Sequence, residues 1–182
     1  MENDAPQVPL HTANLADVLR AINSLKAEGV VTEYALCGAV AALFYTEAIA
    51  TYDIDLYASI PSTGVLVDLG DLYRWAQRRG FDARGEHLII HGVPVQVLPS
   101  TDALTDEGIQ LAQSFTLSDV EIRVMTAEHL AAIALATHRS GKDYERVNRL
   151  IASGRVDLQR LQEIIQQFNL AAWWQEYRRR YE

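Results

Sequence analysis

Two neighbouring stretches decide the expected fold: LCGAVAA at residues 36–42 and TYDIDLY at residues 51–57. The first is typical of a short buried strand that Gly38 breaks, with a helix of small residues after the break. The second alternates in polarity, so a strand would place Asp53 and Asp55 on one face and their apolar neighbours on the other. The two stretches predict a strand, a turn, a helix and a second strand that carries two adjacent carboxylates.

These carboxylates give the first indication of function. Asp53 and Asp55 would repel each other, and burial would raise the pKa of one of them unless a cation lay between them. Proteins often hold Mg²⁺ with one or two carboxylates together with substrate phosphates. The helix after Gly38 would offer free backbone N–H groups to a phosphate. This combination predicts a phosphate site beside a metal site. The plainer alternative is a solvated strand face and a glycine that only packs helix on strand.

Hydrophobic periodicity extends this unit in both directions. It predicts helices at residues 14–27, 68–79 and 102–112, four helices from Thr126 onward, and short strands at 81–83, 87–90, 93–98, 115–117 and 122–124. This order is typical of an α+β fold: a small mixed β-sheet head flanked by helices, with a C-terminal helical bundle. We expect a flexible arm at residues 1–12, an α/β core at 13–125 and a helical tail at 126–182 packed on the core.

Composition narrows the class of protein. The 182 residues hold 16 Lys and Arg against 24 Asp and Glu, a formal net charge of −8, which argues against a duplex-DNA binder. No apolar stretch approaches the roughly 20 residues that a membrane span needs, and no secretory signal is visible, so a cytoplasmic protein without a membrane partner is expected. Cys37 is the single cysteine and excludes an internal disulfide.

The Arg178–Arg180 run follows aromatic residues and could contact single-stranded RNA, although a helix packing its aromatics is the simpler interpretation.

With these motifs together, the sequence resembles the nucleotidyltransferase superfamily of the polymerase-beta type. It is most similar to the AbiEii-like nucleotidyltransferases, some of which are toxins of toxin–antitoxin systems. The resemblance covers about residues 30 to 175. It rests on LCGAVAA (36–42), TYDIDL (51–56), GVPVQVLP (92–99), RSGKD (139–143) and GRVD (154–157).

The resemblance implies an activity: Mg²⁺-dependent or Mn²⁺-dependent transfer of a nucleotide from an NTP to an RNA, such as tRNA, or to a protein. An antitoxin protein is a further implied partner. Asp53 and Asp55 would hold the metal, which would neutralise charge on the leaving pyrophosphate. Gly38 and Ala39 would offer backbone N–H groups to the phosphates, and Lys142 would place a cation on the triphosphate. Asp143 would orient Lys142 or the acceptor. Arg139 could serve in the role of Lys142 or in that of Asp143.

Two residues depart from the family pattern. Ala39 stands where a second glycine or a serine is usual, which keeps the N–H but loses a hydroxyl or glycine's freedom. Gln96 stands on the strand where many members carry a third carboxylate. A neutral amide cannot accept the acceptor's proton, although its oxygen can still serve nucleotide binding or hold a water. Three explanations remain open: Asp143 or Glu86 serves as the base, solvent does, or the chain is a catalytically impaired nucleotide-binding or protein-interaction module.

Overall fold

The computed structural model describes residues 15–47, 51–61, 68–137 and 141–181, so the predicted arm at 1–12 and Arg139 lie outside the described residues. The elements follow in this order: α1 (Leu15–Ala27), β1 (Glu33–Cys37), α2 (Gly38–Ala42), β2 (Ile54–Ser59), α3 (Gly70–Arg78), β3 (Asp82–Arg84), β4 (His87–Ile90), β5 (Val93–Pro99), α4 (Ala103–Gln110), β6 (Gln113–Leu117), β7 (Val120–Val124), α5 (Ala127–Thr137), α6 (Gly141–Ala152), α7 (Leu158–Gln167) and α8 (Ala171–Tyr181).

The described strands form one mixed sheet in the order β3-β4-β5-β2-β1-β7-β6. β1, which ends just before Gly38, and β2, which carries Asp55, are neighbours near the centre of the sheet and run antiparallel. β2 pairs in parallel with β5, and β1 pairs in parallel with β7. The α+β class with a mixed sheet and a C-terminal helical bundle is therefore confirmed.

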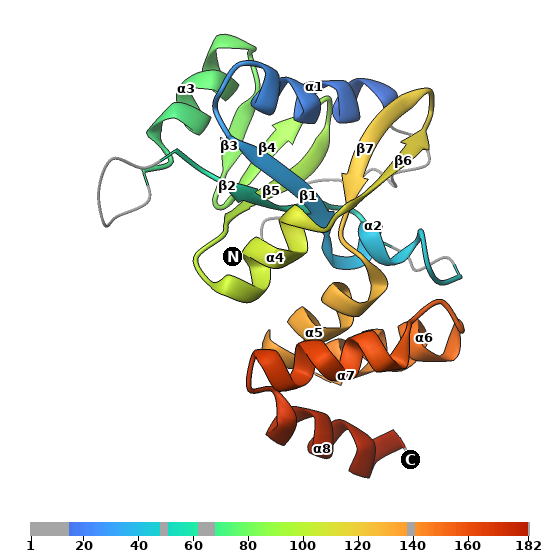
Figure 1. Ribbon diagram of the computed structural model, residues 1–182. Helices are drawn as coiled ribbons and strands as arrows, with labels where there is room; N and C mark the ends of the chain where they lie inside the picture. Colours follow the sequence, from blue (N-terminus) through green and yellow to red (C-terminus); the bar gives the residue numbers. More distant parts are fainter. Residues whose placement is uncertain (1–14, 48–50, 62–67, 138–140, 182) are drawn as a thin grey trace, which may run out of the picture.

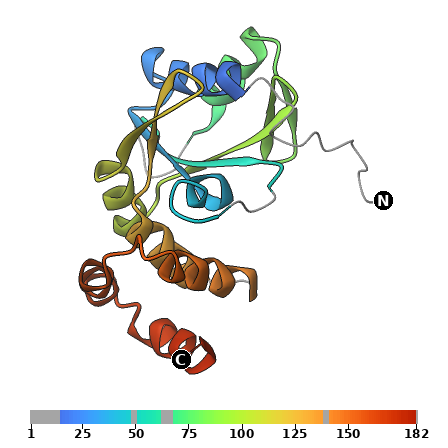
Figure 2. The same ribbon diagram turned by 90° about the vertical axis from the view of Figure 1, so that its right-hand side faces the viewer.

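Helices lie on both sides of this sheet (Figure 1). α1 and α3 lie on one side, where α1 buries an apolar stripe and α3 buries Trp75. α2, α4 and the tail helices α5 to α8 lie on the other side, and Figure 2 shows the tail as a separate layer below the head. The strands alternate accordingly: in β2, Ile54, Leu56 and Ala58 are buried and the residues between them are partly accessible.

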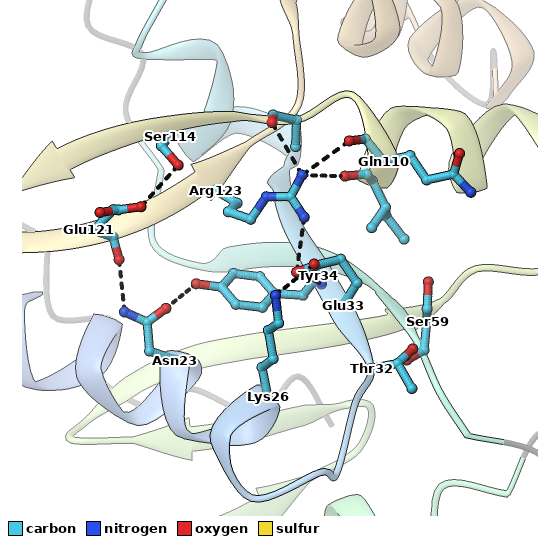
Figure 3. A network of polar contacts seen from close by, with 12 residues as sticks. Asn23, Lys26, Thr32, Glu33, Tyr34, Ser59, Gln110, Ser114, Glu121 and Arg123 are labelled. Carbon is cyan, nitrogen blue, oxygen red and sulfur yellow. Dashed lines mark hydrogen bonds and ion pairs between the residues drawn. The ribbon is translucent and has the colours of Figure 1, made fainter.

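A polar network centred on Arg123 fixes α4 and α1 against the sheet (Figure 3). The Arg123 guanidinium donates to the carbonyls of Ile109, Gln110 and Ala112, at and just after the end of α4, at 3.0 to 3.2 Å. It also pairs with Glu33 at 2.9 Å, and Lys26 of α1 reaches the other oxygen of Glu33 at 2.7 Å. Three segments distant in sequence are thereby joined at β1.

A second polar cluster joins the head to the tail. The buried His129 of α5 lies 3.3 Å from Glu107 of α4 through Nε2, while its Nδ1 lies 2.9 Å from the Thr126 hydroxyl. Glu107 also accepts from Arg160 at 2.8 Å and from Gln167 at 2.6 Å, both on α7. Burial lowers the pKa of His129. Thr126 accepts the His129 N–H at 3.3 Å and so caps the start of α5.

One boundary near the carboxylates differs from the prediction. The strand expected at residues 51–57 begins three residues later, at Ile54. The Thr51 hydroxyl donates to the Asp53 carboxylate at 2.9 Å and to its carbonyl at 3.3 Å. This side-chain turn competes with strand pairing, so Asp53 lies directly before β2 and not on it.

Among the described residues no helix has the length and apolar character needed to cross a bilayer.

Candidate functional site

The junction of β1 and α2 brings backbone onto the Asp55 side chain. Gly38 has φ +65°, and a Cβ built on it would lie 2.2 Å from Asp55 Oδ2 and 3.0 Å from Asp55 Cβ and Cγ. Only glycine fits both this conformation and this space. The predicted break at Gly38 is therefore also a close contact between the turn and the second aspartate.

Strand register places the candidate residues in one line across the sheet. Asp55 on β2 is paired with Cys37 on β1 and with Gln96 on β5, and Gln96 is paired in turn with His87 on β4. Residues that are directly paired point to the same face of a sheet. We call these four residues, Cys37, Asp55, Gln96 and His87, the site row.

Electrostatics distinguish Asp55 from an ordinary surface carboxylate. Burial, and then the neighbouring charge of Asp53, raise the pKa of Asp55 from 3.8 to about 6, while Arg146 acts in the opposite direction. Repulsion within the pair is what the D-x-D spacing predicts, although burial is the larger cause here. Asp53 is partly buried and is oriented by the Thr51 hydroxyl. The two carboxylates thus form a site of concentrated negative charge that a cation would relieve.

A cavity of about 140 Å³ opens in front of Asp55. The sheet and the β1–α2 junction form its floor, and α5 forms a mostly apolar roof. Its lining residues are Cys37, Gly38, Asp55, Tyr57, Gln96 and Leu98 from the floor, Leu130, Ile133, Ala134 and Thr137 from α5, and Arg146 from α6. The cavity therefore combines one carboxyl of raised pKa, one amide and one guanidinium with an apolar wall.

Arg146 is the functional candidate that the sequence analysis missed. Its side chain is 29% exposed and lies 3.9 Å from the Asp143 carboxylate on the same helix. It lines the cavity, and its charge lowers the pKa of Asp55. Arg146 follows Lys142 by four residues and so shares its helix face. That spacing was the available signal, and it would have placed two cations on one side of α6.

The structure brings some predicted residues together and separates others. Gly38, Asp55 and Gln96 line one cavity, and Asp53 lies beside Asp55 in the chain and acts on its pKa. Ala39 is partly buried in the first turn of α2. Lys142 is exposed at the start of α6 and does not line the cavity, whereas its neighbour Asp143 contacts the cavity residue Arg146.

The donor set at this site fits one class of metal. Within the described residues, no three His, Cys, Asp or Glu side chains are grouped to enclose an ion, as a structural zinc site would require. Two neighbouring carboxylates beside an open cavity suit a hard divalent cation that completes its coordination with substrate phosphates and water. Asp53 and Asp55 are the residues that would hold it.

Comparison with known proteins gives structural neighbours only, since no family model and no curated protein matches the sequence. One neighbour is an antigenic nucleotidyltransferase-like protein from Paracoccidioides brasiliensis (TM-score 0.56, 14% identity, 91% of this chain and 94% of that one). Another is the antibiotic-resistance factor ANT(2'')-Ia in solution (TM-score 0.54, 13% identity, 94% and 100%). A crystal structure of ANT(2'')-Ia with adenylyl-2''-tobramycin also matches (TM-score 0.51, 15% identity, 88% and 97%).

At these identities the likeness concerns the fold. It extends over nearly the whole of each chain, head and tail together. The order of elements, the mixed sheet and the position of the helical tail are therefore those of a nucleotidyltransferase-like fold.

Proposed function

We propose that this protein is a Mg²⁺-dependent nucleotidyltransferase that moves a nucleotide from an NTP to a hydroxyl of an RNA or protein acceptor. The observation that carries the proposal is the cavity at which Gly38, Asp55, Gln96 and Arg146 meet. A backbone turn pressed against a carboxylate of raised pKa, opposite a guanidinium, suits the triphosphate of a metal-bound nucleotide.

Each residue has a part in this proposal. Asp53 and Asp55 would be ionised and hold Mg²⁺ or Mn²⁺, which neutralises charge on the triphosphate and on the leaving pyrophosphate. Gly38 and Ala39 would present backbone N–H groups to the phosphates. Arg146 would bind phosphate oxygens from the α6 side, with Lys142 adding charge at the cavity's edge. Asp143 orients Arg146 through their contact.

The chemical class of the acceptor is a more specific proposal than the reaction type. The crystallised ANT(2'')-Ia complex holds an adenylylated aminoglycoside, which supports transfer to a hydroxyl as the reaction type. For this chain we propose an RNA such as tRNA, or a protein, on the strength of its resemblance to the AbiEii-like nucleotidyltransferases, some of which are toxins. With a net charge of −8, an RNA would need a local basic surface, and Arg178, Arg179 and Arg180 provide one at the exposed end of α8. A toxin role in the cytoplasm with a protein antitoxin belongs to the same proposal.

One observation favours a second candidate function. Gln96 is the residue paired directly with Asp55, the place where a third carboxylate would complete the acidic cluster. A chain with an amide there could bind Mg²⁺ and a nucleotide and yet transfer nothing. This alternative is a nucleotide-binding module of the same fold without catalysis.

Two assays test the proposal and separate it from the alternative. The first is the thermal shift caused by each of the four NTPs with Mg²⁺, since a ligand that binds only the folded state raises its stability. Asp53→Asn and Asp55→Asn should abolish the shift, whereas Asp71→Asn, at an exposed acid of α3, should keep it. If no NTP shifts the melting temperature of the wild-type protein, both candidate functions are excluded.

The second assay follows label from each NTP into total RNA, total protein or tobramycin, together with pyrophosphate release. Transfer that needs both aspartates and tolerates Asp71→Asn supports the enzyme. Binding with no transfer and no pyrophosphate release supports the non-catalytic module.

A further inference from the structure

His87 lies on the same face of the sheet as the candidate site, although it is outside the cavity lining. In β4, Leu88 and Ile90 are buried, whereas His87 and Ile89 are partly accessible on the opposite face. His87 is paired with Gln96, and Gln96 with Asp55. Neighbouring strands lie about 4.8 Å apart, so the His87 backbone is about 10 Å from that of Asp55, with Gln96 between them.

The electrostatic environment links the two ends of this line. A positive charge on His87 lowers the pKa of Asp55, and the charge of Glu86 raises it. Within the described part of the chain, further charged groups near the site row are Arg84, which is paired with His87 on β3, Asp53 before β2 and Arg146 from α6. His87 thus belongs to the same charge cluster as the two carboxylates but is not one of the candidate metal ligands.

The direction of the row matters for the reaction. The Gly38 turn lies on the β1 side of Asp55, which is where the proposed triphosphate would bind. An acceptor must approach the reacting phosphorus from the side opposite the leaving pyrophosphate. On this sheet that side holds Gln96 and then His87.

Among the described residues, candidates for removing the acceptor's proton are few on that side. Gln96 is a neutral amide and cannot take a proton. Glu86 is exposed in the turn between β3 and β4, and Asp143 contacts Arg146 on the far side of the cavity. Imidazole is the side chain best suited to exchange a proton near neutral pH.

We propose that His87 is the catalytic residue that accepts the proton from the acceptor hydroxyl, in the place where a third carboxylate is missing. This inference rests on the proposed function. In the step, the acceptor oxygen forms a bond to the α-phosphorus, its proton passes to a ring nitrogen of His87, and the bond from the α-phosphorus to the pyrophosphate oxygen breaks. The pyrophosphate leaves with the electron pair of that bond.

The test compares His87→Asn with a matched control, His91→Asn. His91 lies in the exposed turn after β4 with φ +50°, a conformation that asparagine tolerates. We expect His87→Asn to keep the thermal shift with Mg²⁺ and NTP and to slow label transfer by about 10²- to 10⁴-fold. His91→Asn should match the wild type in both assays.

A second variant distinguishes catalysis from mere structure. Gln96→Asp would supply the missing carboxylate beside Asp55. The double variant His87→Asn with Gln96→Asp should therefore transfer label at least tenfold faster than His87→Asn alone. Added imidazole should rescue a His87→Ala variant in the same way. A structural role for His87 predicts neither form of rescue.

The outcomes separate this inference from the proposed function. Transfer by His87→Asn within threefold of the wild-type rate overturns the role of His87 and leaves the enzyme proposal intact. Loss of the thermal shift in His87→Asn would make His87 a nucleotide-binding residue and would also overturn it. A wild-type protein that transfers nothing to RNA, protein or tobramycin overturns both.

Discussion

At the scale of single residues, Asp55 of the candidate site carries a cost in stability. Its carboxyl is partly buried beneath the Gly38 turn, and burial together with Asp53 raises its pKa to about 6. The D-x-D spacing predicted this repulsion. It could not predict the burial, because burial depends on a turn and a helical roof from other parts of the chain. Nor could it reveal His87, because strand register is set by pairing distant in sequence.

The raised pKa predicts how stability depends on pH in the absence of metal. The folded protein retains the Asp55 proton up to about pH 6, whereas the unfolded chain releases it near its ordinary value of 3.8. The contribution of the neutral Asp55 carboxyl to the free energy of unfolding is therefore fully present below about pH 4. It is lost as pH rises through about 6. Asp55→Asn should be as stable as the wild type at pH 4 and more stable by roughly 1–3 kcal/mol at pH 8.

Urea denaturation in EDTA at several pH values measures this difference directly. Asp71→Asn serves as the control, because its carboxylate pairs with Arg74 one helical turn away on the exposed surface. A stability gain for Asp55→Asn that is equal at pH 4 and pH 8 would contradict the assigned pKa.

At the scale of secondary structure elements, the β1–α2 junction determines whether the site can form. The sequence predicted the break at Gly38 and the helix after it, and α2 does begin there. The strand that follows was expected at Thr51, whereas the Thr51 hydroxyl holds Asp53 in a turn instead. Alternating polarity located the carboxylates, but it could not detect that local competition.

Two glycine variants separate backbone strain from the contact with Asp55. Gly38 and Gly154 have nearly the same backbone conformation, with φ +65° and +69°, but only a Cβ at Gly38 would meet another residue. Gly154→Ala should cost about 1 kcal/mol in the free energy of unfolding through strain alone. Gly38→Ala should cost about 2 kcal/mol more because of the clash, and it should lose the thermal shift with Mg²⁺ and NTP. Equal costs in urea denaturation would show that the turn is not pressed against Asp55.

At the scale of the whole molecule, the helical tail is part of the site. α5 forms the roof of the cavity and α6 brings Arg146 to it, while Glu107, His129 and Arg160 tie α4, α5 and α7 together. From its helical periodicity the sequence predicted a tail of four helices from Thr126 onward, packed on the core. It gave no sign of the Glu107 cluster, because each member looks like an ordinary surface residue of its own helix.

This cluster predicts that head and tail unfold together. Glu107→Ala would leave the buried His129 without its Glu107 contact and Arg160 without that carboxylate, so we expect a loss of about 2–4 kcal/mol. Glu163→Ala removes only the exposed partner of Arg160 on α7 and should cost under about 0.5 kcal/mol.

Calorimetry of the wild-type protein should show one transition whose calorimetric and van't Hoff enthalpies agree. Two separate transitions would show that the tail is an independent unit.

The division of the cavity into a polar floor and an apolar ceiling has an evolutionary consequence. The groups proposed for bond making belong to the head, whereas Leu130, Ile133 and Ala134 come from a single helix whose cavity-facing side chains are hydrophobic. Substitutions along that helix would reshape the space offered to a base, sugar or acceptor while sparing the acids beneath. Reactivity and selectivity would then be inherited from different segments of the gene, so that descendants of one such enzyme could change their targets without rebuilding their chemistry.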